Sequence, residues 1–454
     1  MCFHMDSERL FDLMGDGRVK AEWSFEDGIC KMTLTSSDKT ASFSENTDTD
    51  KMLSPEKREI VCAARAFFRC ASEICGMSPE WGTIDGVKPV RLYLNLVQSG
   101  LCGYDILKNN YLVSDTKARL VRDVGDFEYA LADKIEENSY NLYISIPFCP
   151  TRCKYCSFIS QNVNMSLLLP QYLEVLCREI GETAKILGDK RLSTVYIGGG
   201  TPTVLDESQL ERLLYRINEC FDVSGKEFTL EAGRPDTVTE GKMATALKYG
   251  VSRVSINTQT TNDEVLRKIG RHHTAKQYFD AFKIARDAGI PVINTDLIAG
   301  FSEDTFEKSL EDVISLSPEN LTIHTLCVKN SAGMRDEGFV RRERGLSELI
   351  NHTYAECHNN GYFPYYLYKQ KNAVSGLENV GYSKKGCECI YNICMMSEIN
   401  STVALGAGAS TKIVKKGMVT DRTESFFDCK YPKEYIENRE KAAVKADFLR
   451  SALQ

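Results

Sequence analysis

Three cysteines in the middle of the chain have a spacing that could hold a metal cluster. They are arranged C-x3-C-x2-C, as Cys149, Cys153 and Cys156. Thiolates at similar spacings bind iron–sulfur clusters. Three ligands are one short of the four that a four-iron cluster can take, so one iron keeps an open position for a substrate or cosubstrate. The spacing therefore predicts a catalytic iron–sulfur cluster.

A second group of cysteines lies far downstream and is irregularly spaced. Cys387, Cys389 and Cys394 follow a C-x-C-x4-C pattern, and a fourth ligand would have to come from Cys429. A zinc site would require a matching pair of ligands beside the first group, and this group does not supply it at a suitable distance. We therefore predict packed thiols here and an iron–sulfur cluster rather than zinc upstream.

Strands that alternate with helices are expected to position the first cysteine group. Residues 142–146 form a predicted strand that Pro147 ends, so the cysteines follow its carboxyl end. Further strands are predicted at 194–197, 227–230, 253–257, 292–297 and 320–324. Helices are predicted between them at 170–187, 207–220, 237–249, 261–269, 275–288 and 304–315. Six such units indicate a parallel sheet, whose carboxyl ends form one rim where reactive groups gather.

Polar and glycine residues follow the other predicted strands at the same rim. The second strand runs into Gly198-Gly-Gly-Thr-Pro-Thr203, and Glu231 ends the third. Gln259 follows the fourth strand, Asp296 ends the fifth and His324 ends the sixth. Glycines allow a ligand to approach the backbone closely. The alternatives are an ordinary turn for the glycines, a solvated carboxylate for Glu231 and a hydrogen-bonded rim histidine for His324.

These motifs together resemble the radical S-adenosylmethionine (SAM) superfamily. The segment Tyr143-Ile-Ser-Ile-Pro-Phe-Cys149 and the Gly-Gly-Gly-Thr-Pro element are similar to the HemN-like, oxygen-independent coproporphyrinogen III dehydrogenase branch, and above all to its HemZ-type subgroup. The resemblance implies an incomplete (β/α)6 barrel, a [4Fe-4S] cluster on the three cysteines and SAM on its open iron. It assigns SAM contacts to Tyr143, Tyr155, Gly199, Gly200, Thr201, Glu231, Gln259, Arg271 and Asp296. Arg271 and His324 are the candidates for catalytic residues.

The same resemblance implies a radical SAM oxidoreductase of anaerobic haem biosynthesis. Propionates of coproporphyrinogen III would lose CO2 and become vinyl groups, giving protoporphyrinogen IX, with electrons passing through a low-potential donor. Phe158, however, stands where the biosynthetic enzymes carry a fourth cysteine, as it does in haem chaperones and haem-degrading enzymes. A HemW-like haem chaperone and a radical SAM enzyme that acts on haem therefore stay open. Axial haem ligands for the chaperone could come from His352, His358, Met395 and Met396.

Composition narrows the cellular setting. The chain has 454 residues, a net charge of −7 and 17 cysteines. The negative charge argues against a general nucleic-acid or membrane-surface binder, and no run reaches the roughly 18–20 apolar residues of a membrane span. No signal peptide is visible, so we predict a reducing, cytoplasmic location without disulfide bonds.

The pattern of elements divides the chain into three predicted domains. Residues 1–138 form an α+β accessory domain, with a hairpin or small sheet followed by helices. Residues 139–328 form the barrel, and residues 329–454 form a C-terminal HemN-like α/β region. In that last region Lys369 and Lys371 alternate on an extended segment, where they could meet anionic propionates or protect a sheet edge.

Overall fold

The computed structural model describes residues 19–452, apart from 85–87, 133, 137, 159, 164–166, 302–305, 328–344, 371–372 and 416–421. The chain forms two compact units, Met1–Tyr129 and Ala130–Gln454. The first unit therefore ends slightly before the predicted boundary at residue 138. The predicted division at 328–329 lies outside the described residues and stays a prediction.

The first unit is a small antiparallel sheet covered by helices. Its strands, in the order β1-β2-β3, are Lys20–Glu26, Ile29–Thr35 and Thr40–Asn46. Its helices are α2 (Pro55–Cys75), α3 (Pro89–Gln98), α4 (Gly103–Asn109) and α5 (Asp115–Ala132). Cys62 and Cys70 are buried in the core between α2 and the sheet, where they act as packing residues.

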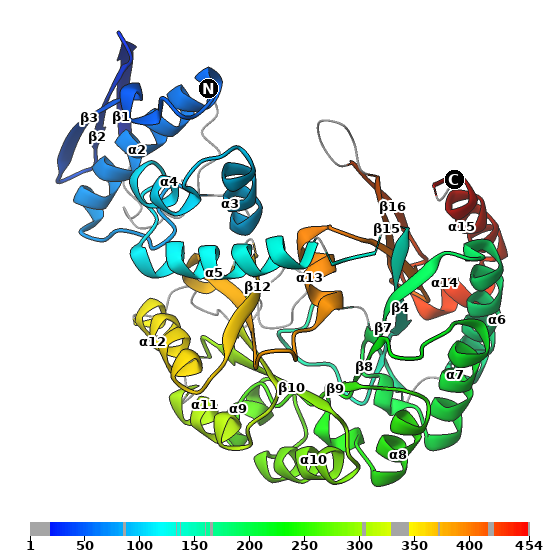
Figure 1. Cartoon of the computed structure of the whole chain (residues 1–454). Coiled ribbons are helices and arrows are strands. Elements are labelled where there is room, and N and C mark those ends of the chain that lie inside the picture. The colour runs from blue at the N-terminus through cyan, green and yellow to red at the C-terminus, as the bar shows by residue number, and fades with distance from the viewer. Residues whose placement is uncertain are drawn as a thin grey trace. The chain divides into compact units, whose positions relative to one another are not determined.

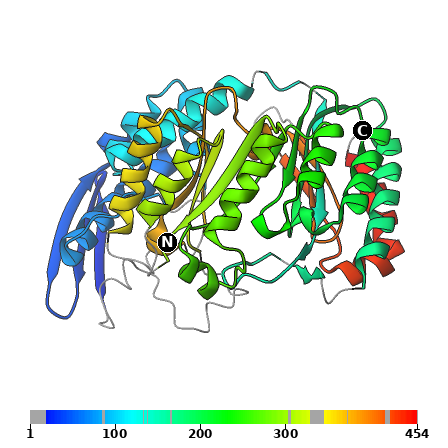
Figure 2. The same ribbon diagram turned by 90° about the horizontal axis from the view of Figure 1, so that it is seen from below.

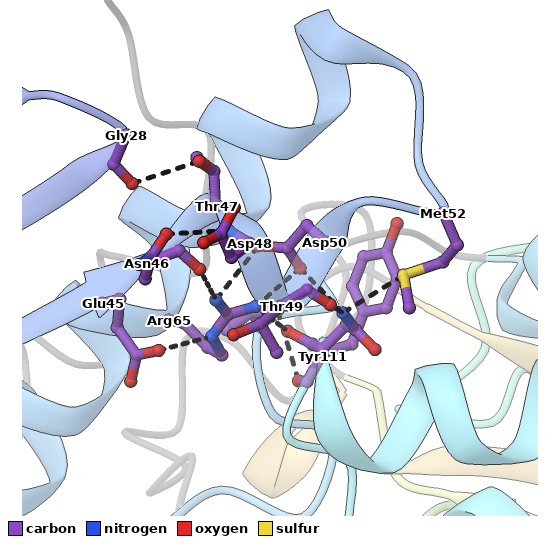
Figure 3. Close-up of polar contacts among 12 residues, drawn as sticks. Gly28, Glu45, Asn46, Thr47, Asp48, Thr49, Asp50, Met52, Arg65 and Tyr111 are labelled. Atoms are coloured by element: carbon purple, nitrogen blue, oxygen red, sulfur yellow. Dashed lines mark hydrogen bonds and ion pairs between the residues drawn. The ribbon is translucent and has the colours of Figure 1, made fainter.

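A buried arginine joins the sheet to α2 in this unit (Figure 3). The guanidinium of Arg65 donates to both carboxylate oxygens of Asp50, at 2.7 and 3.0 Å, and to Glu45 at 2.8 Å. Asp50 also accepts the side-chain amide of Asn110, at 2.7 Å. Removing one partner of such a pair leaves a buried charge unpaired, at a cost of about 3–5 kcal/mol.

Six parallel strands form the centre of the second unit. They are β4 (Ser139–Ile146), β7 (Arg191–Gly199), β8 (Glu227–Glu231), β9 (Arg253–Ser255), β10 (Val292–Ala299) and β11 (Asn320–Thr325). Each strand pairs with the next one along the chain, without a reversal of order. Every right-handed crossover therefore steps in the same direction and leaves its helix on one face of the sheet.

The helices between these strands form an outer layer. They are α6 (Leu169–Leu187), α7 (Glu207–Cys220), α8 (Glu240–Lys248), α9 (Asp263–Lys268), α10 (Ala275–Asp287) and α11 (Phe306–Ser315). Figure 1 shows them around the outside of the curved sheet, and in the view of Figure 2 the green helices form a row along it. This arrangement confirms the predicted partial barrel.

Strands from the C-terminal region extend the barrel sheet at both edges, to eleven strands in all. At one edge β14 (Ser401–Leu405) pairs in parallel with β4, and β15 (Ser410–Lys415) and β16 (Arg422–Phe427) follow antiparallel. At the other edge β13 (Glu378–Ser383) pairs antiparallel with β11, and β12 (Phe363–Lys369) pairs with β13. The outer helices of this region are α12 (Leu346–Asn359), α14 (Pro432–Glu437) and α15 (Arg439–Ala452).

One short helix lies on the inner side of the curved sheet. Figure 1 shows α13 (Ile390–Ser397) in orange at this place, and it packs against β7 and β12. Tyr391 stacks on Tyr196 with ring centroids 4.3 Å apart, and Tyr143 continues the stack at 6.1 Å from Tyr391. These aromatic contacts fix α13 against the first two barrel strands.

A carboxylate from a barrel strand caps the start of α13. Glu227, the first residue of β8, accepts the backbone N–H groups of Ile390 and Tyr391 at 2.8 and 2.9 Å. A negative charge at a helix N-terminus is favourable because the first N–H groups have no partner within the helix. Cys389 and Cys394 are buried beside this contact, and the prediction that they are packed thiols fits their burial.

Candidate cofactor site

A cavity of about 380 Å³ opens at the carboxyl ends of the parallel strands, within the second unit. The three cysteines of the C-x3-C-x2-C group line it. It also contains the predicted site residues Tyr155, Gly199, Gly200, Thr201, Glu231, Gln259, Arg271, Asp296 and His324. Tyr143 does not line the cavity, because it lies in the aromatic stack next to Tyr196, which does. The fold thus brings residues that are distant in the sequence into one site.

The cysteine group begins in a short strand that is held by the end of β7. This strand, β5 (Phe148–Cys149), accepts the backbone N–H of Thr201 on the carbonyl oxygen of Phe148, at 2.8 Å. The Thr201 hydroxyl donates to the Cys149 sulfur at 3.4 Å. Burial raises the pKa of Cys149, and it raises the pKa of Cys156 to about 11. Cys149 and Cys156 are therefore neutral thiols in the free protein, and metal binding would release their protons.

The glycines at the end of β7 have a packing reason that the sequence did not reveal. A Cβ atom added to Gly200 would lie 2.5 Å from the Phe148 carbonyl oxygen. Gly199 has a φ of +108°, which side chains rarely adopt. The close packing of β7 against the cysteine loop therefore requires glycine at both positions, in addition to any approach of a ligand.

Glu231 is a half-buried carboxyl group at the end of β8, and it lines the cavity. The hydroxyl of Tyr196 donates to its Oε1 atom at 2.6 Å. Burial, together with the nearby negative charge of Asp296, raises the pKa of Glu231 to about 7. A cationic ligand would favour the ionised form of such a group, so Glu231 is suited to an ammonium ion.

Asp296 belongs to a polar network with other residues that line the cavity. The side-chain amide of Asn294 donates to Asp296 Oδ1 at 2.8 Å, and Asn257 Oδ1 accepts the Asp296 backbone N–H at 3.2 Å. His324 lies between Asp296 and Tyr368: its Nε2 is 3.6 Å from Asp296 Oδ2, and its Nδ1 is 3.5 Å from the Tyr368 hydroxyl. The histidine is thus placed between a carboxylate and a phenol at the cavity surface.

Gln259 has an unusual backbone conformation for a residue with a side chain. Its φ is +71°, and neighbouring β10 holds it there through two hydrogen bonds: its N–H donates to the Asp296 carbonyl at 2.9 Å, and its carbonyl accepts the Ile298 N–H at 3.0 Å. Such strain persists when the surroundings enforce it and is common at functional sites. Here it directs the Gln259 side chain to the cavity lining.

Arg271 is buried and engaged with protein acceptors. Its Nη1 donates to the Tyr155 hydroxyl at 3.0 Å, and its Nη2 donates to the carbonyl oxygens of Gly233 and Asn257. The Arg271 Nε lies 3.5 Å from Nδ1 of His273. Arg271 therefore connects the cysteine loop with the residues that follow β8 and β9. Its direct contact with SAM or a substrate remains a prediction.

Several cavity residues were missed by sequence reasoning. They are mainly Tyr196, Arg234, Asn257, Tyr366, Tyr368, Asn379 and Asn392. Arg234 carried a usable signal, because it follows the third predicted strand beside Glu231. Asn392 carried none, since its place depends on α13 entering the barrel.

The C-terminal ligand candidates are only partly at the site. Met396 lines the cavity, whereas His352 and His358 are exposed on the outer helix α12. Lys369 is buried on β12 and is not part of the cavity lining, so the expected contact with a propionate in this cavity is not seen. Lys371 lies outside the described residues.

Comparison with known proteins identifies the family. The model of the radical SAM superfamily matches residues 143–313. The oxygen-independent coproporphyrinogen-III oxidase-like protein HemZ of Bacillus subtilis is 36% identical over 384 residues, which cover 80% of this chain and 76% of that protein. The chain belongs to the radical SAM superfamily. Within it, the chain belongs to the group that contains HemZ, HemN and HemW.

Two further proteins of this group are similar to the chain. The haem chaperone HemW of Bacillus subtilis is 38% identical over 192 residues, or 41% of this chain and 50% of HemW. The solved structure of coproporphyrinogen III oxidase (HemN) from Escherichia coli has a TM-score of 0.55 and 19% identity, and covers 72% of this chain and 78% of that one. At this identity the HemN similarity shows the fold alone.

Family membership supplies the cofactors, a [4Fe-4S] cluster and SAM, and the site is suited to both. Among residues 19–452 as described, no three His, Cys, Asp or Glu side chains lie close enough to share one metal ion. A four-iron cluster, by contrast, binds each thiolate to a different iron and requires wider spacing. The cysteine group can thus hold the cluster, and Glu231 can pair with the amino group of SAM.

Proposed function

We propose that this radical SAM protein is an oxidoreductase that converts propionate side chains of coproporphyrinogen III into vinyl groups, with protoporphyrinogen IX as product. The observation that carries the proposal is the cavity itself. One wall holds the cysteines and the polar strand ends, and the facing wall comes from β12, β13 and α13 of the C-terminal region. Similarity to HemZ over 80% of this chain supports the same assignment.

When bound, the cluster and SAM together supply a 5′-deoxyadenosyl radical that abstracts a hydrogen atom from the substrate. The chain's own residues bind and orient. The three cysteines hold the cluster, Glu231 accepts the ammonium of SAM, and Gln259 with Asp296 lines the rest of that pocket. Their place in a cavity that the C-terminal region also lines would limit the access of bulk water to the reacting groups.

The facing wall has the character of a site for a pyrrole ring. The rings of Tyr366 and Tyr368 are nearly parallel, with centroids 6.4 Å apart, and both line the cavity. Asn379 and Met396 add an amide and a polarisable thioether. In this proposal His324 hydrogen-bonds the substrate, with its ring oriented by Asp296 and Tyr368.

The pKa of Glu231 leads to a prediction about SAM binding. Because the carboxyl group has a pKa of about 7 and the ammonium of SAM requires its ionised form, SAM affinity should fall as the pH drops from 8 to 6. Glu231→Gln should weaken SAM binding roughly tenfold or more at pH 8 and remove this pH dependence. The dissociation constant of SAM, measured by anaerobic equilibrium dialysis on cluster-loaded protein at pH 6, 7 and 8, tests both expectations.

The exposed residue Glu240 on α8 provides the control for this measurement. Glu240→Gln removes the same charge at a residue that does not line the cavity, and it should leave both the affinity and its pH profile unchanged. A wild-type dissociation constant that is flat between pH 6 and 8 would contradict the role given to Glu231.

The reaction is tested with the reconstituted protein under anaerobic conditions. Protein, SAM, a one-electron reductant and coproporphyrinogen III are incubated together, and vinyl products and CO2 are measured by mass spectrometry. The proposal expects two molecules of CO2 per protoporphyrinogen IX. Cleavage of SAM without any loss of CO2 would overturn the assignment of the substrate and would favour haem as the substrate instead.

A haem chaperone is the second candidate, favoured by the similarity to HemW and by Met396 at the cavity surface. It predicts that the protein retains haem stoichiometrically while producing no 5′-deoxyadenosine. Met396→Leu would then weaken haem binding, whereas the dehydrogenase assignment expects no stable haem complex.

Among the described helices, none combines the length and the apolar composition that crossing a membrane requires. A cytoplasmic site of action remains part of this proposal.

A further inference from the structure

Arg234 is a buried charged residue with one hydrogen-bonding group left over. It follows β8, is 2% exposed and lines the cavity. Its Nε donates to Asp236 at 3.2 Å, and its Nη1 donates to the hydroxyl of Thr151 at 2.9 Å and to the Thr151 carbonyl at 3.3 Å. Within the described part of the chain, its Nη2 is buried and has no acceptor.

An unsatisfied N–H on a buried guanidinium is unfavourable, so its retention indicates a ligand that completes the contact. The corresponding atom of the other cavity arginine is already engaged, because Nη2 of Arg271 donates to two backbone carbonyl oxygens. Arg234 is therefore the better-placed donor for an anionic group at the cavity.

Several contacts place Arg234 beside the cysteine loop. Thr151, which its Nη1 contacts, lies between Cys149 and Cys153 in the chain. The hydroxyl of Thr151 also donates to the carbonyl oxygen of Gly270, at 3.2 Å, which ties this loop to the segment that carries Arg271.

The groups around Arg234 leave its Nη2 atom without a hydrogen-bond partner in the described part of the chain. His273 lies near both arginines, and burial together with their charges lowers its pKa to about 2. It is therefore neutral and adds no charge of either sign at physiological pH. Asp236 contacts the Nε side of the guanidinium, and Nη2 remains for a ligand.

We propose that Arg234 is a positioning residue for the iron–sulfur cluster: its Nη2–H donates to a sulfur atom of the bound cluster and its charge favours the reduced form. One-electron reduction adds one negative charge to the cluster, and a nearby fixed positive charge stabilises that form more than the oxidised one. Hydrogen bonds to sulfur raise the potential of such clusters in the same direction. The electron comes from an external one-electron reductant, dithionite in the test below. The inference rests on cluster binding by the family and not on the identity of the substrate.

The test compares Arg234→Gln and Arg234→Lys with the wild-type protein. Each is reconstituted, its iron content is measured, and its cluster is titrated with dithionite and followed by electron paramagnetic resonance, without SAM or substrate. Arg234→Gln should shift the midpoint potential to more negative values, so that at a fixed potential the ratio of reduced to oxidised cluster falls by roughly tenfold or more, as expected for one charge-assisted hydrogen bond. Arg234→Lys, which keeps the charge, should show a smaller shift.

Arg152 provides a matched control on the same loop. It is exposed to solvent, so Arg152→Gln removes an equal charge whose effect water screens, and its midpoint potential should shift clearly less than that of Arg234→Gln. If Arg234→Gln fails to load iron, the comparison is made with Arg234→Lys. An unshifted potential in an iron-loaded Arg234 variant would overturn the proposal.

SAM affinity separates the proposal from its nearest competitor. If the Arg234 variants keep the wild-type potential but bind SAM more than tenfold more weakly, the residue serves the carboxylate of SAM and the proposal is wrong. Because neither measurement includes a tetrapyrrole, failure of the proposed decarboxylation leaves this result unaffected.

Discussion

Replacing Cys149, Cys153 and Cys156 together by alanine is expected to abolish both the cluster and the cleavage of SAM. The three thiols are the cysteines of the C-x3-C-x2-C loop, and without them the bound iron has no protein ligands from that loop. Iron content and the visible absorbance of the reconstituted protein should fall to background. Formation of 5′-deoxyadenosine after reduction, measured by chromatography with mass detection, should fall with them.

The fold should survive this change. None of the three side chains belongs to the buried core, since each is only partly covered at the cavity. The unfolding midpoint of the cluster-free proteins should therefore be similar with and without the substitutions, which separates loss of the cluster from loss of the fold.

Cys327 is the matched control, because it lines the same cavity just beyond β11. Cys327→Ala should retain full iron and full SAM cleavage. If it loses iron as the triple variant does, a fourth cysteine is a ligand and the open position on the cluster would be in question. Full iron in the triple variant would contradict the assignment of the ligands altogether.

The barrel was predictable because its signals are local. Each of the six strands was expected within a few residues of its observed position, since a short apolar run of β-branched residues is followed by glycine or polar residues. The cysteine loop, Glu231 and Asp296 were expected at one rim for the same reason: parallel strands in consecutive order place all their carboxyl ends together.

The C-terminal region was less predictable because its contacts are distant in sequence. The pairing of β14 with β4 joins residues about 260 positions apart, and β13 joins β11 across a shorter interval. No local pattern in these strands specifies their partners. The entry of α13 into the barrel depends on Glu227 and on the stack of Tyr391 with Tyr196, which only the folded chain brings together. For this reason the wall of the cavity that β12, β13 and α13 form was not predicted.

A buried lysine shows how the C-terminal helix supports the cofactor site. The ammonium group of Lys445, on α15, donates to Glu179 of α6 at 2.6 Å, to Asp428 at 2.6 Å and to the carbonyl oxygen of Ala404. Glu179 also accepts the backbone N–H of Gly406 at 3.0 Å. One buried cation thus holds two helices and the loop after β14 together.

That loop reaches the strand that leads to the cysteines. The carbonyl oxygen of Ala407 accepts the Ser145 hydroxyl at 2.8 Å, and its N–H donates to the Tyr172 hydroxyl at 3.0 Å. Tyr172 in turn donates to the Ser145 carbonyl at 2.8 Å. Ser145 lies near the end of β4, directly before the turn into the cysteine loop. Disturbance at Lys445 therefore has a short path to the cluster ligands.

Lys445→Ala is expected to destabilise the second unit by about 3–5 kcal/mol, because it leaves two buried carboxyl groups without their cation. Burial already raises the pKa of Asp428 to about 7 even with the lysine present, so one of the two groups should take up a proton in the variant. Urea unfolding measures the loss of stability, and iron content after reconstitution measures its effect on the cysteine loop, which should also fall. Arg450→Ala on the same helix is the control: Arg450 is exposed and pairs with the exposed Asp447, so its removal should cost less than about 1 kcal/mol. Equal stability of the two variants would mean that the buried cation does not hold α15 to the barrel. Normal iron loading in a destabilised Lys445 variant would show that the contacts through Ser145 do not affect the cluster ligands.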